Sequence, residues 1–168
     1  ALEIDQQNEK LWYEKGELHR KLKQWEEAEI CFQNATEIDY TFGEAWLKLS
    51  QTKERLENLG GAEEGYHIAL ELEGNKGLVN LGLGRVQSKL GKVKEALKSV
   101  EKAIALMGED YRPYMVRGDI YFGLGDYERA DSKGYSKAVN IRPDLKRGWR
   151  KLTKVYRSQD KKKRKQGI

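Results

Sequence analysis

The residue types that most often catalyse reactions or bind metals are sparse in this sequence. It contains two histidines, His19 and His67, and a single cysteine, Cys31. Zinc sites use cysteine and histidine pairs at short, characteristic spacings, and no such pair occurs here. We therefore predict no metal site, no cofactor and no enzymatic activity. Because Cys31 adjoins Phe32, we expect its thiol to pack in the core.

Two glycine motifs invite comparison with phosphate-binding loops. These are Gly82-Leu83-Gly84 and Gly123-Leu124-Gly125. A phosphate-binding loop needs a preceding strand and a following lysine, and neither motif has them. Acidic residues are abundant but spread along the chain, as solubility requires. We find no set of residues arranged for catalysis.

The informative residues instead recur every 34 positions. An aromatic residue or asparagine begins each unit, at Trp12, Trp46, Asn80 and Tyr114. A small residue follows four places later, at Gly16, Ser50, Gly84 and Gly118. An alanine lies sixteen places after the first residue, at Ala28, Ala62, Ala96 and Ala130. Internal periods of this length are typical of repeat architectures. The pattern restarts a fifth time at Trp149, Leu152 and Tyr156.

These residues resemble the tetratricopeptide repeat, whose signature is Trp, Leu-Gly, Tyr, Ala, Phe, Ala and Pro over 34 residues. The resemblance covers nearly the whole chain, with departures. Lys15 replaces the Leu, the Pro appears only as Pro143, and the Tyr is replaced by His19, Lys53 and Gln87. From its place in the motif we expect His19 to pack in the core, and we expect His67 to face solvent.

The resemblance implies an all-α, right-handed superhelical solenoid of about four helix-turn-helix repeats plus a C-terminal capping helix. Apolar residues at helical spacing support helices independently, and glycine turns every 15 to 20 residues argue against a coiled coil. We predict helices over 9–23, 25–39, 43–57, 59–73, 77–90, 93–107, 111–124, 127–142 and 146–162. The repeats are 9–42, 43–76, 77–110 and 111–145, preceded by a lead-in over 1–8 and followed by a capping helix over 146–160 and a basic tail over 161–168.

The fourth repeat is one residue longer than the others. Ala130 and Tyr135 are five positions apart, whereas Ala28 and Phe32 are four apart. A helix commonly absorbs one extra residue as a π-bulge. We predict such a bulge at Ser132, Lys133 and Gly134.

The two ends of the chain differ. The first five residues, Ala1 to Asp5, echo the end of a second helix, Ala35 to Asp39. We interpret the chain as a piece of a longer array, the alternative being a short lead-in. Either way we expect Leu2, Ile4 and Leu11 to form an open, self-associating end. In the last helix we expect Trp149, Leu152, Val155 and Tyr156 to be buried.

Charge is divided unevenly along the chain. From Lys146 to the end there are eleven basic residues and one acid, while the rest carries 21 basic and 26 acidic residues. Clustered Lys and Arg attract phosphate, so binding of nucleic acid or an anionic surface through the last helix and tail is an alternative function. Its basic patch is Arg147, Arg150, Lys154, Lys161, Lys162, Lys163, Arg164 and Lys165.

The resemblance places the first helix of each repeat on a concave surface that binds a partner protein. One position after the aromatic residue or asparagine of each repeat, Leu47, Leu81 and Met115 would form an apolar line beside mixed charges. An exposed apolar row suits a helix or extended peptide; the alternative is that the row fills space between adjacent first helices. The expected groove residues are Tyr13, Glu17, Leu47, Gln51, Leu78, Leu81, Arg85, Arg112, Met115 and Asp119.

One branch of the family holds a chaperone's C-terminal carboxylate with a clamp of Lys, Asn, Asn, Lys and Arg. The matching places here hold Tyr13, Glu17, Lys48, Leu78 and Gly82, so we do not expect that ligand. No run of 18 apolar residues predicts a membrane span, and the single cysteine fits a reducing compartment. The expected function is thus a cytoplasmic protein-interaction scaffold within a larger array or complex.

Overall fold

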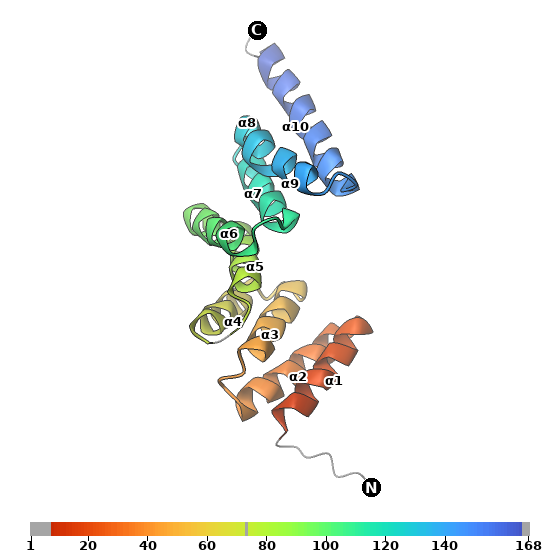
Figure 1. Ribbon diagram of the computed structural model, residues 1–168, viewed down its shortest axis with the longest axis vertical. Helices are drawn as coiled ribbons and strands as arrows, with labels where there is room; N and C mark the ends of the chain where they lie inside the picture. Colours follow the sequence, from red (N-terminus) through yellow and green to blue (C-terminus); the bar gives the residue numbers. More distant parts are fainter. Residues whose placement is uncertain (1–7, 73, 166–168) are drawn as a thin grey trace.

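A computed structural model describes residues 8–72 and 74–165, which form helices joined by short turns and contain no strand. The helices stack in sequence order from one end of an elongated molecule to the other (Figure 1). Their bounds are α1 Glu9–Lys21, α2 Trp25–Ile38, α3 Gly43–Arg55, α4 Leu59–Glu71, α5 Lys76–Lys89, α6 Val93–Met107, α7 Tyr111–Gly123, α8 Tyr127–Arg129, η1 Ala130–Tyr135, α9 Ser136–Ile141 and α10 Lys146–Lys165. The predicted all-α solenoid of four helix pairs and a final helix is confirmed.

The turn inside each repeat uses one residue with a positive φ angle. In the third and fourth repeats it is a glycine, Gly91 (φ 76°) and Gly125 (φ 71°). The equivalent residues of the first two repeats are Lys23 (φ 61°) and Glu57 (φ 58°). A left-handed residue ends a helix by redirecting the chain, and glycine adopts this conformation without steric cost. The same turn geometry therefore sets the angle between the helices of every pair.

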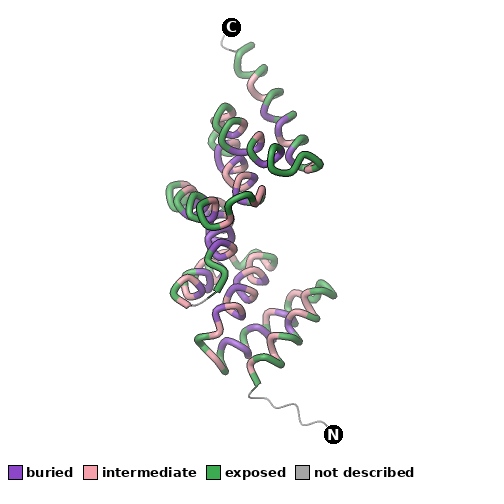
Figure 2. The backbone as a smooth tube through the Cα atoms, in the orientation of Figure 1, coloured by how far each residue is buried: buried purple, intermediate pink, exposed green. Residues whose placement is uncertain are grey.

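Within each pair, a small residue on the first helix lets the second helix approach closely. A β-carbon at Gly16 would lie 2.7 Å from the ring of Phe32, and one at Gly118 would lie 2.7 Å from the ring of Tyr135. Phe32 and Tyr135 are completely buried. Buried residues line the faces where helices meet, as Figure 2 shows. The periodic small residues thus fix the pairing, because larger side chains would force the helices apart.

The second helix of the fourth repeat contains a π-helical segment. It runs from Ala130 to Tyr135, between α8 and α9. This confirms the predicted bulge at Ser132 to Gly134. The extra residue is absorbed within the segment, so Tyr135 still reaches Gly118 as Phe32 reaches Gly16.

Helix α10 differs from its prediction in two ways. Leu152 and Val155 are buried against the fourth repeat as expected, but Trp149 and Tyr156 are 52% and 49% exposed. The prediction that both aromatics are buried was wrong, because α10 packs on one side only and these rings lie outside that contact. The helix also continues to Lys165, three residues beyond the predicted helix over 146–162 and into the predicted basic tail over 161–168.

The first helix pair also departs from expectation. His19 is only half-buried, and its Nδ1 lies 2.8 Å from Oε1 of Gln24 across the turn, so the expected core position was wrong. His67 is exposed, as predicted. Leu11 and Leu18 are exposed on α1, although the equivalent residues of α5, Val79 and Val86, are buried. Leu2 and Ile4 lie outside the described residues, so association through this end stays a prediction.

Candidate functional site

Ion pairs join neighbouring first helices along the inner face of the solenoid. Lys48 of α3 lies 3.4 Å from Glu17 of α1, and Arg85 of α5 lies 2.7 Å from Glu54 of α3. At the other end, the Lys151 ammonium of α10 lies 2.7 Å from the carboxylate of Asp119 on α7. These pairs recur because residues about one repeat apart occupy equivalent places on adjacent helices.

The junction between α5 and α7 is different. Among the described residues, no ion pair joins these two helices. Cations face the junction from both sides, with Arg85 on α5 and Arg112 on α7. The Arg112 guanidinium donates hydrogen bonds to the Asp110 carboxylate, which raises the pKa of Arg112, and the nearby positive charge of Arg85 opposes that rise. Like charges across this seam favour an anion between them.

A cavity of about 450 Å³ opens at this junction. Its floor is apolar and its rim carries four cationic side chains and one carboxylate. It is lined by Leu81, Arg85, Ser88, Lys89, Tyr111, Arg112, Met115, Val116, Asp119, Leu145 and Arg147. A concave apolar surface with a few placed polar groups is the usual form of a binding site.

Asp119 organises the C-terminal side of the cavity. It accepts a 2.7 Å hydrogen bond from the Tyr135 hydroxyl and pairs with Lys151, so it is already satisfied. Burial of Tyr135 and its bond to Asp119 raise the pKa of its hydroxyl, which stays protonated and donates. The Arg147 guanidinium lies 3.5 Å from the Asp119 carboxylate, farther than the Lys151 ammonium at 2.7 Å, and Arg147 is the most exposed of these side chains. Arg147 is therefore the cation that contacts within the chain hold least firmly.

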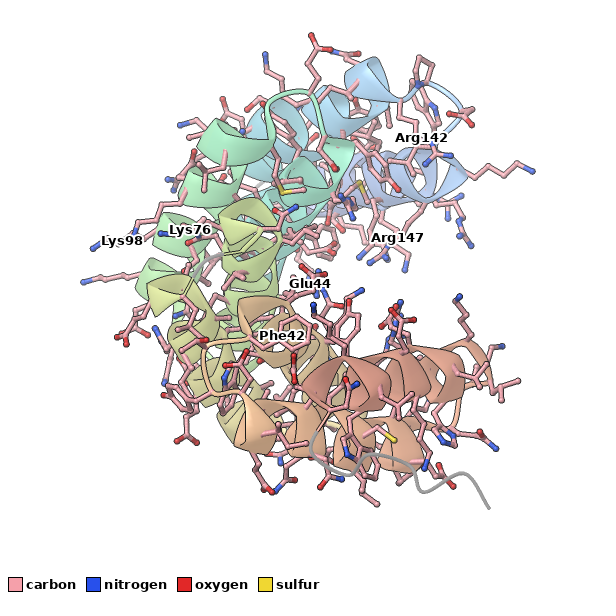
Figure 3. All side chains as sticks on the ribbon, turned by 60° about the horizontal axis from the view of Figure 1, so that its bottom comes forward. Phe42, Glu44, Lys76, Lys98, Arg142 and Arg147 are labelled. Atoms are coloured by element: carbon pink, nitrogen blue, oxygen red, sulfur yellow. The ribbon has the colours of Figure 1, made fainter. Side chains whose placement is uncertain are left out.

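The curvature of the solenoid brings the start of α10 back toward the N-terminal helices. A second hollow is lined by Arg20 of α1, Gln51 of α3, Arg85 of α5 and Arg147 of α10, among others. Figure 3 shows Arg147 on the inner side, while Lys98 of α6 points away on the outer side. In the second hollow, Arg147 shares the lining with residues from the C-terminal part of α3, including Gln51 and Arg55. The inner face thus forms one continuous groove around the α5–α7 cavity.

The apolar row predicted for this groove is not accessible. Leu47, Leu81 and Met115 are 1%, 2% and 5% exposed, so the alternative holds: they fill space between helices. Leu47 packs with Val79 and Leu83 in the core. Leu81 and Met115 still contribute the floor of the cavity. Their burial arises because neighbouring first helices cover them from the side.

The remaining predicted residues divide between the cavity and its surroundings. Arg85, Arg112 and Asp119 line the cavity, and Gln51 lines the second hollow. Glu17 is held by Arg20 and Lys48. Tyr13 packs against Phe32 and Phe42, and Leu78 packs against the core of the second repeat, so neither lines the cavity.

Sequence reasoning missed several lining residues. Lys89 and Val116 lie one helical turn after Arg85 and Arg112, so helical spacing could have found them. Tyr111 and Leu145 come from the beginning of α7 and the turn before α10. No sequence signal pointed to these two.

Two family models, both described as Tetratricopeptide repeat, match this chain. One covers residues 9–42, and the other covers residues 79–106 and 111–145. The chain belongs to the tetratricopeptide repeat family. A comparison with curated proteins found no match.

Solved structures of other proteins share the tetratricopeptide repeat fold. A crystal structure of MamA is 21% identical, with a TM-score of 0.75 over 86% of this chain and 84% of that one. YrrB, described as "a TPR protein with an unusual peptide-binding site", is 19% identical, with a TM-score of 0.73 over 95% and 82%. The "APC/C hetero-tetramer Cut9-Hcn1" is 20% identical, with a TM-score of 0.83 over 95% of this chain and 32% of the other. At these identities the likeness establishes the fold.

The basic patch of this tetratricopeptide repeat chain is exposed but does not form one site. Arg147 faces the groove, whereas residues 161 to 165 lie near the turn between α7 and α8, beside Leu124 and Tyr127. Arg150 and Lys154 are exposed between them. The described residues hold no cluster suited to a metal ion and no helix able to span a membrane. Burial raises the pKa of the Cys31 thiol, which favours its protonated, unreactive form.

Proposed function

We propose that this chain is a protein-interaction scaffold whose concave groove binds a peptide segment of a partner at the α5–α7 cavity. The observation that supports the proposal is the junction between α5 and α7. Arg85 and Arg112 face each other across this junction, and the cavity beside them has an apolar floor. A buried thiol is compatible with the reducing cytoplasm as the place of action.

The lining defines the chemistry of the peptide. Arg85, Lys89, Arg112 and Arg147 surround an apolar floor. Its partly exposed residues are Tyr111, Val116 and Leu145, and the buried Leu81 and Met115 complete the lining. All four cations have carboxylate partners within the chain: Glu54, Glu57 and Asp110 lie within 3.0 Å of Arg85, Lys89 and Arg112, and Asp119 lies 3.5 Å from Arg147. A segment with an acidic residue beside a large apolar one would place its carboxylate between the guanidinium groups and its apolar side chain against the floor. Charge-assisted hydrogen bonds from Arg give such contacts orientation.

The fold comparison supports a peptide partner without naming it. YrrB is described as having a peptide-binding site, which shows that a scaffold of this fold can bind one. We propose the site from this chain's own α5–α7 cavity.

A peptide library tests the proposal directly. Random peptides displayed on phage would be selected on the purified chain, and the enriched peptides measured by fluorescence anisotropy. We expect Asp or Glu within two positions of Leu, Phe or Met. Arg112→Ala should weaken binding of these peptides about tenfold, or about 1.4 kcal/mol. The variant should still fold, because Arg112 is exposed and its ion pair is with Asp110, two residues away in the sequence.

The matched control is Lys98→Ala, which removes a cation from the outer side of α6 (Figure 3). It should leave affinity unchanged. Enriched peptides without acids, or peptides that bind Arg112→Ala as well as the unaltered chain, would contradict the proposal.

A further inference from the structure

Helix α10 reproduces the local structure of a first helix of a repeat. The indole Nε1 of Trp149 donates to the carbonyl of Pro143 at 2.8 Å, and that of Trp46 donates to the carbonyl of Tyr40 at 2.8 Å. Thr153 Oγ1 donates to the Trp149 carbonyl, as Ser50 Oγ does to that of Trp46. Position for position, Trp149 and Thr153 copy Trp46 and Ser50.

In the four complete repeats this face is covered by the repeat's own second helix. The residues equivalent to Thr153 are Gly16, Ser50, Gly84 and Gly118, and all four are buried. A β-carbon at Gly16 or Gly118 would touch the second helix of its own repeat, and Ser50 lies against Gly65 of α4. In α10, Thr153 is exposed beside the half-exposed Trp149. Within the described residues, which end at Lys165, no helix follows to cover this face.

The charges around this face define what would cover it. Residues 146–165 carry eleven bases and one acid. At 100° per residue, Lys146, Arg150, Arg157 and Arg164 lie on the exposed side next to Trp149. In the second repeat, the helix that covers Trp46 is α4, which carries three glutamates and no Lys or Arg. An incoming helix with the same acidic character would complement α10.

We infer that the Trp149–Thr153 face of α10 binds an acidic amphipathic helix of another protein, which completes the fifth repeat. The partner helix would place a Gly or Ala against Thr153, as α4 places Gly65 against Ser50. Its acidic residues would face Arg150 and Arg157. Trp149 and Thr153 do not line the α5–α7 cavity, so this is a second interaction surface.

The chain's own α4 supplies a probe. A synthetic peptide of residues 58–72 carries the Asn58 cap, Gly65 and Glu63, Glu64 and Glu71. Titrated into ¹⁵N-labelled chain, it should shift the indole N–H signal of Trp149 saturably. Because isolated helices of this length are marginal in water, binding is expected only at high micromolar to millimolar peptide. The Trp46 indole signal should stay in place, since native α4 already covers it.

Substitutions of two kinds separate the contribution of charge to peptide binding from the contribution of packing. Trp149→Ala should weaken the peptide about tenfold or more. The double reversal Arg150→Glu with Arg157→Glu alters exposed side chains only, and it should weaken binding at least as much while α10 stays helical by circular dichroism. A peptide with its three glutamates changed to glutamine should bind about tenfold more weakly.

Four results would overturn the inference. The Trp149 signal could stay fixed up to millimolar peptide, or respond equally to the glutamine peptide. A short oligouridylate could bind more tightly than the peptide and move Trp149, which would make the face a nucleic-acid surface. Sedimentation could reveal a dimer that Trp149→Ala disperses, which would make the occupant a second copy of this chain.

Discussion

Glu54 connects three helices at the centre of the groove. Its carboxylate accepts hydrogen bonds from Arg85 at 2.9 and 2.7 Å and from the hydroxyl of Tyr66 at 3.2 Å. Burial raises the pKa of Glu54, but the hydrogen bonds and positive charge of Arg85 outweigh burial and lower the pKa overall. The carboxylate that holds Arg85 in the cavity rim is therefore ionised in the folded chain.

This pairing predicts how stability depends on pH. A carboxyl group with a depressed pKa in the folded state stabilises the chain above its unfolded pKa, about 4.3 for Glu. That stabilisation is lost as pH falls through the folded value. Glu54→Gln should therefore lower the urea midpoint at neutral pH and lose less further stability on acidification. Urea unfolding at neutral and acidic pH measures how the free energy of unfolding changes with pH in the unaltered chain and in Glu54→Gln. An equal change in the two proteins would contradict the prediction.

Leu81 shows where residue-level sequence reasoning failed. Helical periodicity identifies an apolar stripe, but it does not say whether a partner or a neighbouring helix covers it. First helices of a solenoid pack against their second helix and also against the adjacent first helices, so their buried sector is wide. In α5, nine of fourteen residues are buried. Placing the groove one position after the aromatic residue or asparagine of each repeat therefore selected core residues.

A substitution follows from this burial. Leu81→Ala should cost about 2–5 kcal/mol of unfolding free energy, as for other buried leucines. Leu18→Ala, at a 57% exposed leucine of α1, should cost well under 1 kcal/mol. Urea denaturation followed by circular dichroism compares the two. A Leu81→Ala chain as stable as Leu18→Ala would restore Leu81 as an accessible groove residue.

At the scale of elements, the fourth repeat shows how an insertion is tolerated. The π segment keeps Tyr135 in register with Gly118, at the cost of irregular hydrogen bonding over Ala130–Tyr135. Gly134 makes the segment possible, because a β-carbon there would collide with the backbone of Gly118. Spacing alone predicted the bulge, since Ala130 and Tyr135 must both face α7.

Gly134→Ala should therefore destabilise the chain by about 1–3 kcal/mol, the usual cost of overpacking. The matched control is Gly123→Ala, where a β-carbon meets nothing within 4 Å. Alanine is the better helix former, so Gly123→Ala should be neutral or stabilising. Thermal unfolding of both variants tests this prediction. Equal melting temperatures would contradict it, because they would show that η1 can move away from α7 without a loss of stability.

The ends of a helix were predictable where the repeat pattern marks both of them, and less predictable where it marks only one. The turn residues at 23, 57, 91 and 125 recur with the 34-residue period, so the paired helices were placed within a few residues. Nothing in the repeat fixes the end of α10 or says which of its faces is covered. The exposure of Trp149 and Tyr156 could not be read from a motif in which the equivalent tryptophan is normally packed.

Across the whole molecule, burial is greatest in the middle and least at the ends. Helix α5 contacts helices on several sides, whereas α1 has one buried residue of thirteen and α10 has three of twenty. In a repeat array each unit is stabilised mainly by its neighbours. A terminal helix has a neighbour on one side only, so its opening costs less free energy than global unfolding.

Hydrogen exchange should therefore be slowest in α5 and α6 and faster in α1 and the second half of α10. Exchange followed by mass spectrometry at low protein concentration would give this gradient, and equal protection of α1 and α5 would contradict it. Repeating the measurement at high concentration tests the exposed face of α1 that carries Leu11 and Leu18. If copies associate there, protection should rise in α1 while α5 stays unchanged, because only the uncovered helix gains a neighbour. Changing Leu11 and Leu18 to glutamine should remove the concentration dependence and leave the rest of the gradient in place.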